Sequence, residues 1–378
     1  RLLALWGTNR VGQRDTLHAV AIAPPRVLLI GFEIADDTGH YPGVEDVFPS
    51  ASRMQRAVFD LCGLRSTAQD TRPWLRHAAW PEDAFPLAAD RMPSPPPLPL
   101  DDYAFVRVEG DGVHEIAVGP VHAGIIEPGH FRFSVVGEKV LRLEERLGYV
   151  HKGIERRFTE LPILDGHRLA ARVSGDSGVA YAWSYCQALE RMTGITVPTR
   201  ASWLRALALE LERIANHLGD LGALGNDAGF AFGLAQFSRL KEHLLRATEQ
   251  ALGQRYLLDL VVPGGTRNDL APAGAAGLDA CLVQLTDEVT VVRGIYEEHT
   301  GLRDRFAGAG AVLPDLAAWL GLVGLAGRAS GQTLDLRVDT ACAPYDELAV
   351  RRCTQQDGDV LARVTLRFDE LAESVRLL

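Results

Sequence analysis

Apolar residues recur every three or four positions in the middle of the chain, beginning just after Trp203. The members of this file are Leu204, Leu207, Leu211, Ile214, Leu218 and Leu221. The spacing matches the helical repeat of about 3.6 residues, so these side chains share one face of a helix. Similar files lie in residues 179–192, 234–252 and 278–296. We therefore predict a bundle of long helices that pack through their apolar faces.

Two further segments have the helical period. Residues 364–378 predict another apolar helix, and because a core helix rarely ends a chain, we expect the sequence to continue beyond Leu378. Residues 50–61 predict a shorter helix near the start of the chain, with Ser50 or Ser52 as its N-terminal cap.

Alternation of apolar and polar residues predicts strands elsewhere. Residues 16–35 read as two strands joined by a turn at Pro24 and Pro25. Short strands rich in β-branched or aromatic residues are predicted, with glycines between them, at residues 105–108, 115–118 and 131–136.

A proline-rich segment, MPSPPPLPL, interrupts these patterns at residues 92–100. Prolines lack a backbone donor and favour an extended chain, so this segment is predicted to be a linker. The predicted fold class is α+β. A small α/β module over residues 1–91 precedes the linker, and residues 101–378 form a short antiparallel sheet followed by the long-helix bundle.

Composition limits the class of protein. The chain has 378 residues, is 47% hydrophobic and carries a formal net charge of −10. That apolar fraction is too high for a disordered chain, and net acidity argues against nucleic acid or anionic lipid as a direct partner. The sequence contains no apolar run of about 18 residues, so we expect no direct membrane span. The five cysteines include no CxxC pair, so local spacing predicts no zinc or iron–sulfur site.

The first candidate for chemistry is the Gly- and Pro-rich segment between two predicted strands, which carries His122, Glu127 and His130. Loops on rigid scaffolds are frequent functional sites, and histidine passes protons near neutral pH and hydrogen-bonds carbonyl groups. The alternative is an ordinary hairpin loop with solvated histidines.

The second candidate is RVSGDSG, residues 172–178, just before a predicted helix. It carries Arg172, Ser174, Asp176 and Ser177. Free backbone amides at a helix N-terminus bind anions and polar groups. The alternative is a plain helix cap, which serine or aspartate provides without any ligand.

The third candidate is a set of polar residues on the longest predicted helix: Glu210, Glu212, Arg213, Asn216, His217 and Asp220. Among them, Glu210, Arg213 and His217 are spaced by three and four residues, which places these three on one face beside the leucine file. Such a polar file in a bundle core can relay protons. The alternative is a solvated outer face with ion pairs between successive turns.

Seven segments, read in order, resemble one family. They are GPVHAGIIEPGHFRF, GYVHKGIERRF, ARVSGDSGVAYA, LELERIANHLGDLGALGNDAGFAF, LVVPGG, GRASG and GDVLARVTLRFDELAESVRLL. The chain resembles the large subunit of membrane-bound, formate-hydrogenlyase-type (group 4) [NiFe] hydrogenases and its relative, the D-type subunit of NADH-quinone oxidoreductase (complex I). The segments FPSASRMQRAVFDLCGL and WPEDAFPL resemble the end of the C-type subunit of complex I, which is fused to the large subunit in that hydrogenase branch.

One departure from the hydrogenase pattern changes the expected cofactor. Catalytic hydrogenases have RVCGxCG where this chain has serines at Ser174 and Ser177. In those enzymes the two thiolates bind nickel and iron, and a neutral, hard hydroxyl does not replace a thiolate. We therefore expect no NiFe centre and no bound metal. A second CxxC pair in the family lies near the C-terminus, beyond Leu378.

Resemblance to the D-type subunit implies a quinone site, held by a His of the GPxH loop and a Tyr of the RVSGDSG segment. His122 matches the His. The Tyr position falls on Gly175, and Tyr181 lies six residues further on. The resemblance also moves Arg172 and Asp227 into the cleft as catalytic candidates.

The resemblance thus assigns three groups of candidates. The catalytic residues are His122, Arg172 and Asp227. The substrate-binding residues of the quinone-type cleft are His122, Glu127, His130, Ser174, Asp176, Ser177 and Tyr181. The proton-coupling residues are Glu210, Arg213 and His217.

Two functional hypotheses follow from the resemblance. The first is a subunit of an oxidoreductase complex on the cytoplasmic face of the cell membrane. It would have a small iron–sulfur subunit and membrane subunits as partners, and a quinone or related molecule as acceptor. The second is a non-catalytic structural or coupling subunit that retains a vestigial hydrogenase cleft. The two serines and the missing tyrosine favour the second, and the serines nearly exclude an active hydrogenase.

Overall fold

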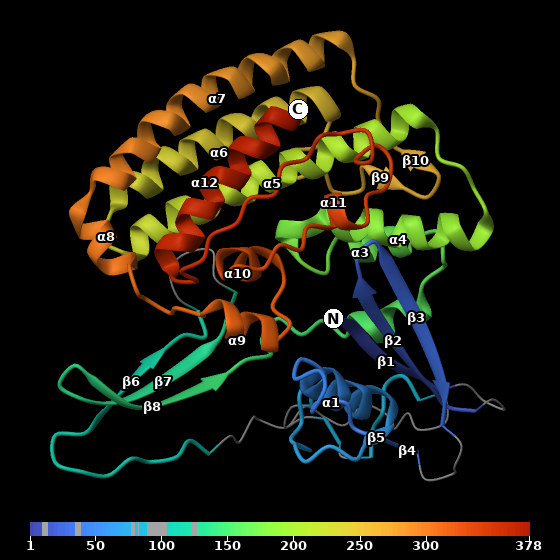
Figure 1. The fold of residues 1–378 in the computed structure, drawn as a ribbon, viewed down its shortest axis with the longest axis vertical. Coiled ribbons are helices and arrows are strands. Elements are labelled where there is room, and N and C mark those ends of the chain that lie inside the picture. Colours follow the sequence, from blue (N-terminus) through green and yellow to red (C-terminus); the bar gives the residue numbers. More distant parts are fainter. Residues whose placement is uncertain (10–13, 35–38, 77–79, 82, 89–103, 122–126) are drawn as a thin grey trace. The chain divides into compact units, whose positions relative to one another are not determined.

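The computed structural model describes residues 1–9, 14–34, 39–76, 80–81, 83–88, 104–121 and 127–378. Its contacts divide the chain into two compact units (Figure 1). The first comprises residues 1–23 and 27–157, and the second comprises residues 24–26 and 158–378. The predicted linker lies largely outside the described residues, so the proposed boundary at residues 92–100 stays a prediction.

The N-terminal part of the first unit is a three-stranded sheet with a helix packed on it. The sheet has the order β1 (Leu2–Thr8), β2 (Thr16–Ala23) and β3 (Arg26–Glu33). Helix α1 (Ala51–Cys62) contacts β1, and a short parallel pair joins β4 (His40–Tyr41) to β5 (Arg65–Ser66). The core contains Leu5, Leu17, Ile34, Tyr41, Val58, Cys62 and Leu64. The predicted strand pair and helix are confirmed, but Ser50 makes no side-chain capping bond.

A second antiparallel sheet follows, in the order β6 (His114–Val118), β7 (His130–Val136) and β8 (Lys139–Arg146). Two of the three short strands predicted for this part of the chain are therefore confirmed. The strand predicted at residues 105–108 is wrong, because residues 104–109 form no strand in the described structure. The Val106 N–H donates to the Glu144 carboxylate at 3.1 Å instead of joining a ladder.

The second unit is a bundle of long helices around α5. Its long helices are α4 (Gly178–Thr193), α5 (Thr199–Asp227), α6 (Ala231–Leu252), α7 (Pro272–Glu298) and α12 (Val360–Leu377). Helix α5 contacts α4, α6 and α12, so the last helix of the chain packs against the middle of the sequence (Figure 1). The leucine file is buried at Leu204, Leu211, Leu218 and Leu221. The predicted bundle is confirmed.

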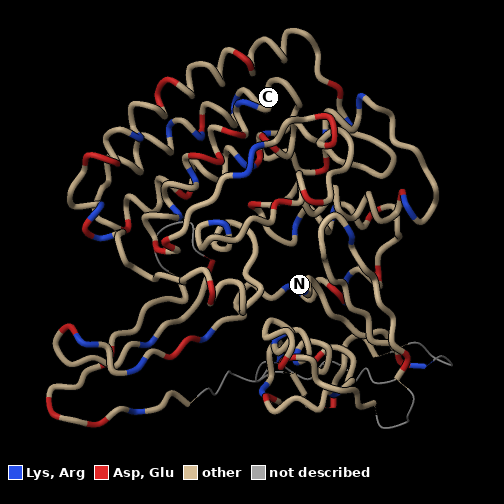
Figure 2. The backbone as a smooth tube through the Cα atoms, in the orientation of Figure 1, with Lys and Arg blue, Asp and Glu red and all other residues tan. Residues whose placement is uncertain are grey.

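Shorter elements complete the chain. They are α2 (Ile154–Glu160), α3 (Gly166–Ala170), η1 (Gly175–Ser177), β9 (Val261–Val262), β10 (Gly265–Thr266), α8 (Thr300–Phe306), α9 (Pro314–Trp319), α10 (Gly324–Ala329) and α11 (Leu336–Asp339). Charges of both signs are interspersed along the helices of the bundle (Figure 2). None of the helices in the described part of the chain is long and apolar enough to cross a membrane.

A buried ion pair fixes α5 to the β9–β10 turn. The Arg205 guanidinium, 2% exposed, donates to both carboxylate oxygens of Glu190 on α4, at 2.7 and 3.1 Å. It also donates to the carbonyl oxygens of Val262 and Gly265, at 2.8 and 3.0 Å. The Gly264 N–H donates to Glu190 at 2.9 Å, so both charges of the pair are also hydrogen-bonded to backbone.

Replacement of Arg205 by alanine is expected to lower the free energy of unfolding by about 3–5 kcal/mol, because it leaves a buried carboxylate unpaired. Arg200 on the same helix provides the control. Its pair with Asp269 is exposed, at 63% and 66%, so Arg200→Ala should cost about 1 kcal/mol or less. Urea denaturation of both variants measures the difference. Equal losses would show that the buried pair has no special role.

Candidate functional site

Arg172 lies between α3 and η1, where a carboxylate holds its side chain in one orientation. Its Nη1 donates to Asp259 Oδ1 at 2.6 Å, and its Nη2 donates to Oδ2 at 2.9 Å. Nη1 also donates to the Arg168 carbonyl oxygen at 2.8 Å. The hydrogen bonds from Arg172 hold the pKa of the Asp259 carboxyl below its usual value. The Arg172 side chain as a whole is nevertheless 48% exposed, so its guanidinium, held in one orientation by Asp259, lies near the surface here.

Asp259 adopts an unusual backbone conformation. Its φ is +62° and that of Leu257 is +57°, in the left-handed region that residues other than glycine rarely occupy. Such strain is retained where the surrounding structure requires it, and it clusters at functional sites. The strained turn brings Asp259 to Arg172 from a distant part of the chain.

Ser174 directly precedes η1 and Ser177 is its last residue, and both are half-buried. Neither side chain makes a capping hydrogen bond, so the plain serine cap considered from the sequence is wrong. A residue of another helix caps α4 instead. Glu212 of α5 accepts from the Val179 N–H at 2.7 Å and from the Ala180 N–H at 3.3 Å.

The side chains available at this site differ from those that a NiFe centre needs. Ser174 and Ser177 offer hydroxyls, whereas nickel sites of this family require thiolates. Cys186 of α4 is fully buried, and burial raises the pKa of its thiol to about 12. Within the described residues, no group of three or more His, Cys, Asp or Glu side chains is arranged to hold a metal ion. At residues 174 and 177 the hydroxyls are hard, neutral donors, unlike the thiolates that the resemblance implies for a NiFe centre.

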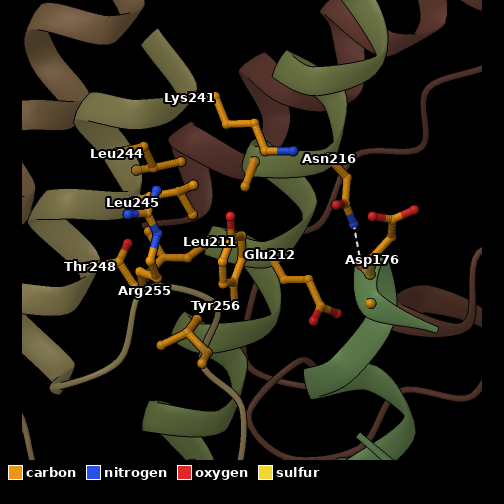
Figure 3. Close-up of a pocket in the computed structure, with 13 residues that line it drawn as sticks. Asp176, Leu211, Glu212, Asn216, Lys241, Leu244, Leu245, Thr248, Arg255 and Tyr256 are labelled. Atoms are coloured by element: carbon orange, nitrogen blue, oxygen red, sulfur yellow. Dashed lines mark hydrogen bonds between the residues drawn. The ribbon is translucent and has the colours of Figure 1, made fainter. Parts of the chain in front are cut away.

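Asp176 and Asn216 are brought together at the side of this segment. The Asn216 side-chain amide donates to the Asp176 backbone carbonyl oxygen, which fixes η1 to α5 (Figure 3). Tyr181, in the first part of α4, is 44% exposed. Asp227 is exposed at the end of α5, eleven residues beyond Asn216, or about 16 Å along the helix. The structure therefore does not bring Asp227 next to Asp176.

The loop candidates belong to the first unit. His122 lies outside the described residues, and Glu127 is exposed. His130 is buried at the start of β7, where its Nδ1 lies 3.2 Å from the Gly119 carbonyl oxygen and its ring is 5.2 Å from that of Phe105. The expectation that these residues share a cleft with Arg172 stays a prediction.

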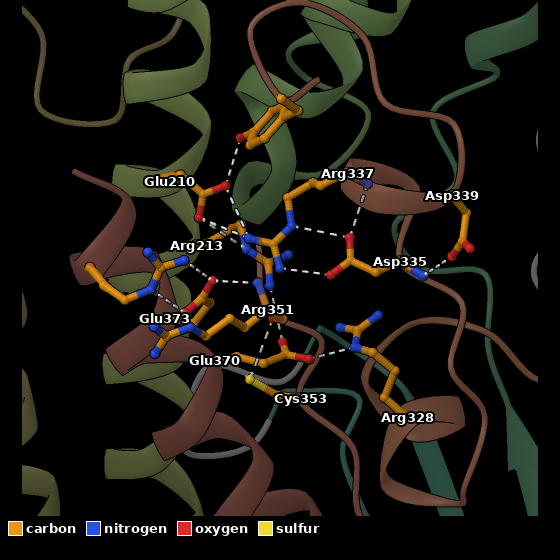
Figure 4. Close-up of polar contacts among 12 residues, drawn as sticks. Glu210, Arg213, Arg328, Asp335, Arg337, Asp339, Arg351, Cys353, Glu370 and Glu373 are labelled. Carbon is orange, nitrogen blue, oxygen red and sulfur yellow. Dashed lines mark hydrogen bonds and ion pairs between the residues drawn. The ribbon is translucent and has the colours of Figure 1, made fainter. Parts of the chain in front are cut away.

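The three proton-coupling candidates face the interior of the bundle. Glu210 is 1% exposed and accepts from the Tyr345 hydroxyl at 2.6 Å and from Arg337 at 3.1 Å (Figure 4). Arg337 also donates to Asp335 at 2.7 Å. The Arg213 guanidinium lies 3.6 Å from Glu210. The solvated-face alternative is therefore wrong for this set.

Glu370 of α12 joins the same network. Its carboxylate accepts from Arg213 at 3.1 Å, lies 3.4 Å from His217 Nε2 and pairs with Arg328 (Figure 4). Burial opposes its ionisation, but hydrogen bonds from His217 and Arg328 and the nearby arginine charges hold its pKa below the usual range. Burial lowers the pKa of His217 to about 4, so its imidazole is neutral at pH 7.

The sequence analysis missed four of the residues that hold this site. They are Asp259, Arg328, Arg337 and Glu370. A signal was present for two of them. Arg328 and Glu370 lie within the segments GRASG and GDVLARVTLRFDELAESVRLL that carried the resemblance. Glu212 was part of the polar set predicted on the long helix, but its role as the cap of α4 was not predicted.

Comparison with known proteins gives consistent matches. The family described as "Respiratory-chain NADH dehydrogenase, 49 Kd subunit" matches residues 227–378. Formate hydrogenlyase subunit 5 of Escherichia coli (strain K12) is 31% identical over 358 residues, covering 93% of this chain and 63% of that protein. The carbon monoxide-induced hydrogenase of Rhodospirillum rubrum is 32% identical over 269 residues, covering 70% of this chain and 74% of that protein.

A solved structure agrees with these matches. A chain of the membrane-bound sulfane sulfur reductase, an archaeal respiratory membrane complex, superposes with a TM-score of 0.66 at 25% identity. The match covers 70% of this chain and 71% of that one. The chain spans less than two thirds of the length of formate hydrogenlyase subunit 5. By sequence and by fold, it belongs to the family that unites the 49 kDa subunit of respiratory-chain NADH dehydrogenase with subunits of membrane-bound hydrogenases.

Proposed function

We propose that this chain is a subunit of a membrane-associated oxidoreductase complex and forms part of an acceptor cleft at residues 172–178. A quinone or a related small molecule is reduced there, with electrons delivered by a small iron–sulfur subunit. Membrane subunits hold the complex at the cytoplasmic face of the cell membrane. Similarity to formate hydrogenlyase subunit 5 and to a chain of a membrane-bound respiratory complex supports the assignment to a complex with membrane subunits. The acceptor and the iron–sulfur subunit are proposed from the sequence resemblance alone.

The geometry of Arg172 carries this proposal. The Arg172 guanidinium is held by Asp259 and by the Arg168 carbonyl oxygen, and the side chain as a whole is 48% exposed, so the charge is oriented before any ligand arrives. A preorganised cation stabilises negative charge that develops on a carbonyl oxygen as the acceptor is reduced. In this proposal His122 hydrogen-bonds or protonates that carbonyl, and Asp227 links the cleft to proton uptake.

The same proposal excludes a NiFe centre. Ser174 and Ser177 supply hydroxyls where the cluster needs thiolates, and no step of the proposed reaction passes through a metal on this chain. In this proposal Ser174, Asp176, Ser177 and Tyr181 supply polar groups to the acceptor site, and the assignment of Glu127 and His130 to the same site stays a prediction from the resemblance.

Replacement of Arg172 by alanine tests the proposal. We expect acceptor reduction by the purified complex to fall by about 10²–10³-fold, because one preorganised charge at the reacting oxygen is removed. A photoreactive quinone analogue should label residues 172–178 in the wild type. This labelling should be lost in Arg172→Ala and in His122→Ala. Arg200→Ala, which removes an exposed arginine at the start of α5, is the control and should retain activity and labelling. Unchanged reduction and labelling in Arg172→Ala would refute the cleft.

A second candidate function is a non-catalytic coupling subunit. The network around Glu370 favours it, because Glu370 is held ionised and His217 is held neutral, so neither is ready to relay a proton at pH 7. In this alternative, Glu210, Arg213 and His217 transmit a conformational change between α5 and α12. It predicts that no quinone analogue labels the chain, while Glu370→Gln still uncouples the assembled complex.

A further inference from the structure

Strand β3 has an exposed edge and two exposed faces. It lies at one side of the sheet ordered β1-β2-β3, and in the part of the chain that the structure describes no other strand pairs with its outer edge (Figure 1). Every residue of its sequence, RVLLIGFE, is exposed, and its five large apolar side chains are 51–68% exposed. A contiguous apolar strip of this kind is typical of a surface that another chain covers.

The exposed apolar side chains lie on both faces of β3. A Cβ added to Gly31 would lie 3.8 Å from His18 Nδ1, so the odd-numbered residues of β3 face the same side of the sheet as His18. The even-numbered residues face the opposite side, where Leu17 joins the core with α1. Apolar residues on both faces are typical of a strand inside a sheet, not of a solvated edge. They are Val27 and Leu29 on one face and Leu28, Ile30 and Phe32 on the other.

A hydrogen bond at the end of β3 indicates which backbone groups point to the outer edge. The Ile34 N–H donates to the Asp15 carbonyl oxygen at 2.8 Å, on the side of β2. In an antiparallel ladder every second residue bonds to the same neighbouring strand, so the even-numbered residues of β3 bond to β2. The odd-numbered residues therefore direct their N–H and C=O groups outward. They are Val27, Leu29, Gly31 and Glu33.

The outer edge of β3 lacks the residues that keep natural edge strands from pairing. Solvated edges usually carry lysine, another charged residue or proline, which make addition of a further strand unfavourable. Residues 27–32 contain none of these, and charges occur only at the two ends of the strand, at Arg26 and Glu33. The edge is therefore suited to accept an extended segment through main-chain hydrogen bonds.

The positions of these two charges favour a second copy of the same strand. When two copies of β3 run antiparallel, the Arg26 end of each lies beside the Glu33 end of the other, so opposite charges meet at both ends. A parallel arrangement would bring like charges together at both ends. The strand is therefore complementary to itself in one direction only.

One antiparallel register pairs all four outward-facing residues within β3. It places Ile30 opposite Ile30 of the second copy, Leu29 opposite Gly31 and Val27 opposite Glu33, so the bulky Leu29 meets a residue without a side chain. The alternative register with Leu29 on the two-fold axis places Glu33 opposite Pro25, which has no N–H to donate.

We infer that β3 pairs with β3 of a second copy of this chain, antiparallel and with Ile30 on the two-fold axis. The two three-stranded sheets then form one continuous sheet, which hydrogen-bonds both outer edges and covers apolar side chains on both faces. The pairing does not depend on the proposed function, because it involves no residue of the candidate cleft.

Cysteine cross-linking of the purified complex tests the register. Ile30→Cys should form a disulfide between two copies under mild oxidation, because opposed residues that are not hydrogen-bonded to each other have Cα atoms about 4.5 Å apart. Leu29→Cys is the matched control. Its two copies would lie diagonally, about 7–8 Å apart, and should not be linked. The wild type, oxidised in the same way, should give no cross-linked dimer.

Charge reversal tests whether the partner is a second copy. Arg26→Glu and Glu33→Arg should each weaken self-association about tenfold in sedimentation, because like charges then meet at both ends. The double variant Arg26→Glu/Glu33→Arg should restore it, since the opposite charges are exchanged but still meet. Circular dichroism should show the same fold in all variants. A single copy in the wild-type complex, a cross-link through Leu29→Cys but not through Ile30→Cys, or no rescue in the double variant would overturn the inference. Loss of acceptor labelling with self-association intact would refute the cleft alone.

Discussion

Replacement of Glu370 by glutamine is expected to lower the free energy of unfolding by about 3–5 kcal/mol. The Glu370 carboxylate, 2% exposed, meets Arg213 and His217 of α5 and Arg328 of α10. Glutamine keeps the shape of the side chain but not its charge, so Arg213 and Arg328 are left without their shared counter-ion. Desolvated charges without a partner are among the most costly defects in a protein interior.

The neighbouring residue offers a matched control for this prediction. Asp369 is 30% exposed and pairs with Arg293 at 2.9 Å, so Asp369→Asn should cost about 1 kcal/mol or less. Chemical denaturation of the two variants and the wild type compares them directly. If Glu370→Gln is no less stable than Asp369→Asn, the network does not hold α12 to α5.

Two buried groups, His217 and Glu212, are expected to change the free energy of unfolding with pH in opposite directions. In the folded chain His217 binds a proton only below about pH 4, whereas in the unfolded chain it binds one below about pH 6.5. The free energy of unfolding therefore rises with pH between these two values. Glu212 acts in the opposite direction. In the folded chain the Glu212 carboxyl stays protonated up to about pH 7, whereas in the unfolded chain it loses its proton above about pH 4.5. The free energy of unfolding therefore falls as the pH rises between these two values.

Single variants separate these contributions. The shifted pKa of each group changes the free energy of unfolding by about 3 kcal/mol across its pH window. The two changes have opposite sign, so they nearly cancel in the wild type between pH 4.5 and 6.5. Over that range, His217→Gln should lose stability as pH rises, and Glu212→Gln should gain it. His114→Gln, at an exposed position of β6, is the control and should follow the wild type. Denaturant unfolding at a series of pH values measures all four profiles, and parallel profiles would contradict the burial of both groups.

Much of the fold could be predicted from the sequence because its signals are local. The leucine file specifies the buried face of α5, and the same period marks α4, α6, α7 and α12. The strand predicted at residues 105–108 failed for a non-local reason. The Val106 N–H bonds to Glu144, whose position depends on the register of β8. Alternation of residue types does not show which partner a backbone group finds.

The candidate site was predictable only in part, for the same physical reason. The spacing of Glu210, Arg213 and His217 showed that they share a face, but whether that face was buried depended on their distant partners Arg337 and Glu370. The sequence also did not indicate that a carboxylate of α5 caps α4. Serine is a common capping residue, so the serines before α4 gave no reason to expect a cap from another helix.

The role of Arg172 also depends on a contact that no motif shows. Asp259, a residue at positive φ and far along the chain, orients the guanidinium that the sequence placed only near a helix start. The arrangement of this site therefore follows from tertiary packing, while its candidate chemistry follows from residue type.

We propose an acceptor cleft at residues 172–178, where the resemblance to [NiFe] hydrogenases implies a metal centre. The most direct test is elemental analysis of the purified complex for nickel, with the double variant Ser174→Cys/Ser177→Cys measured alongside it. The account predicts no stoichiometric nickel in the wild-type complex, because the hydroxyls of Ser174 and Ser177 do not bind it. Stoichiometric nickel in the wild type would contradict the account.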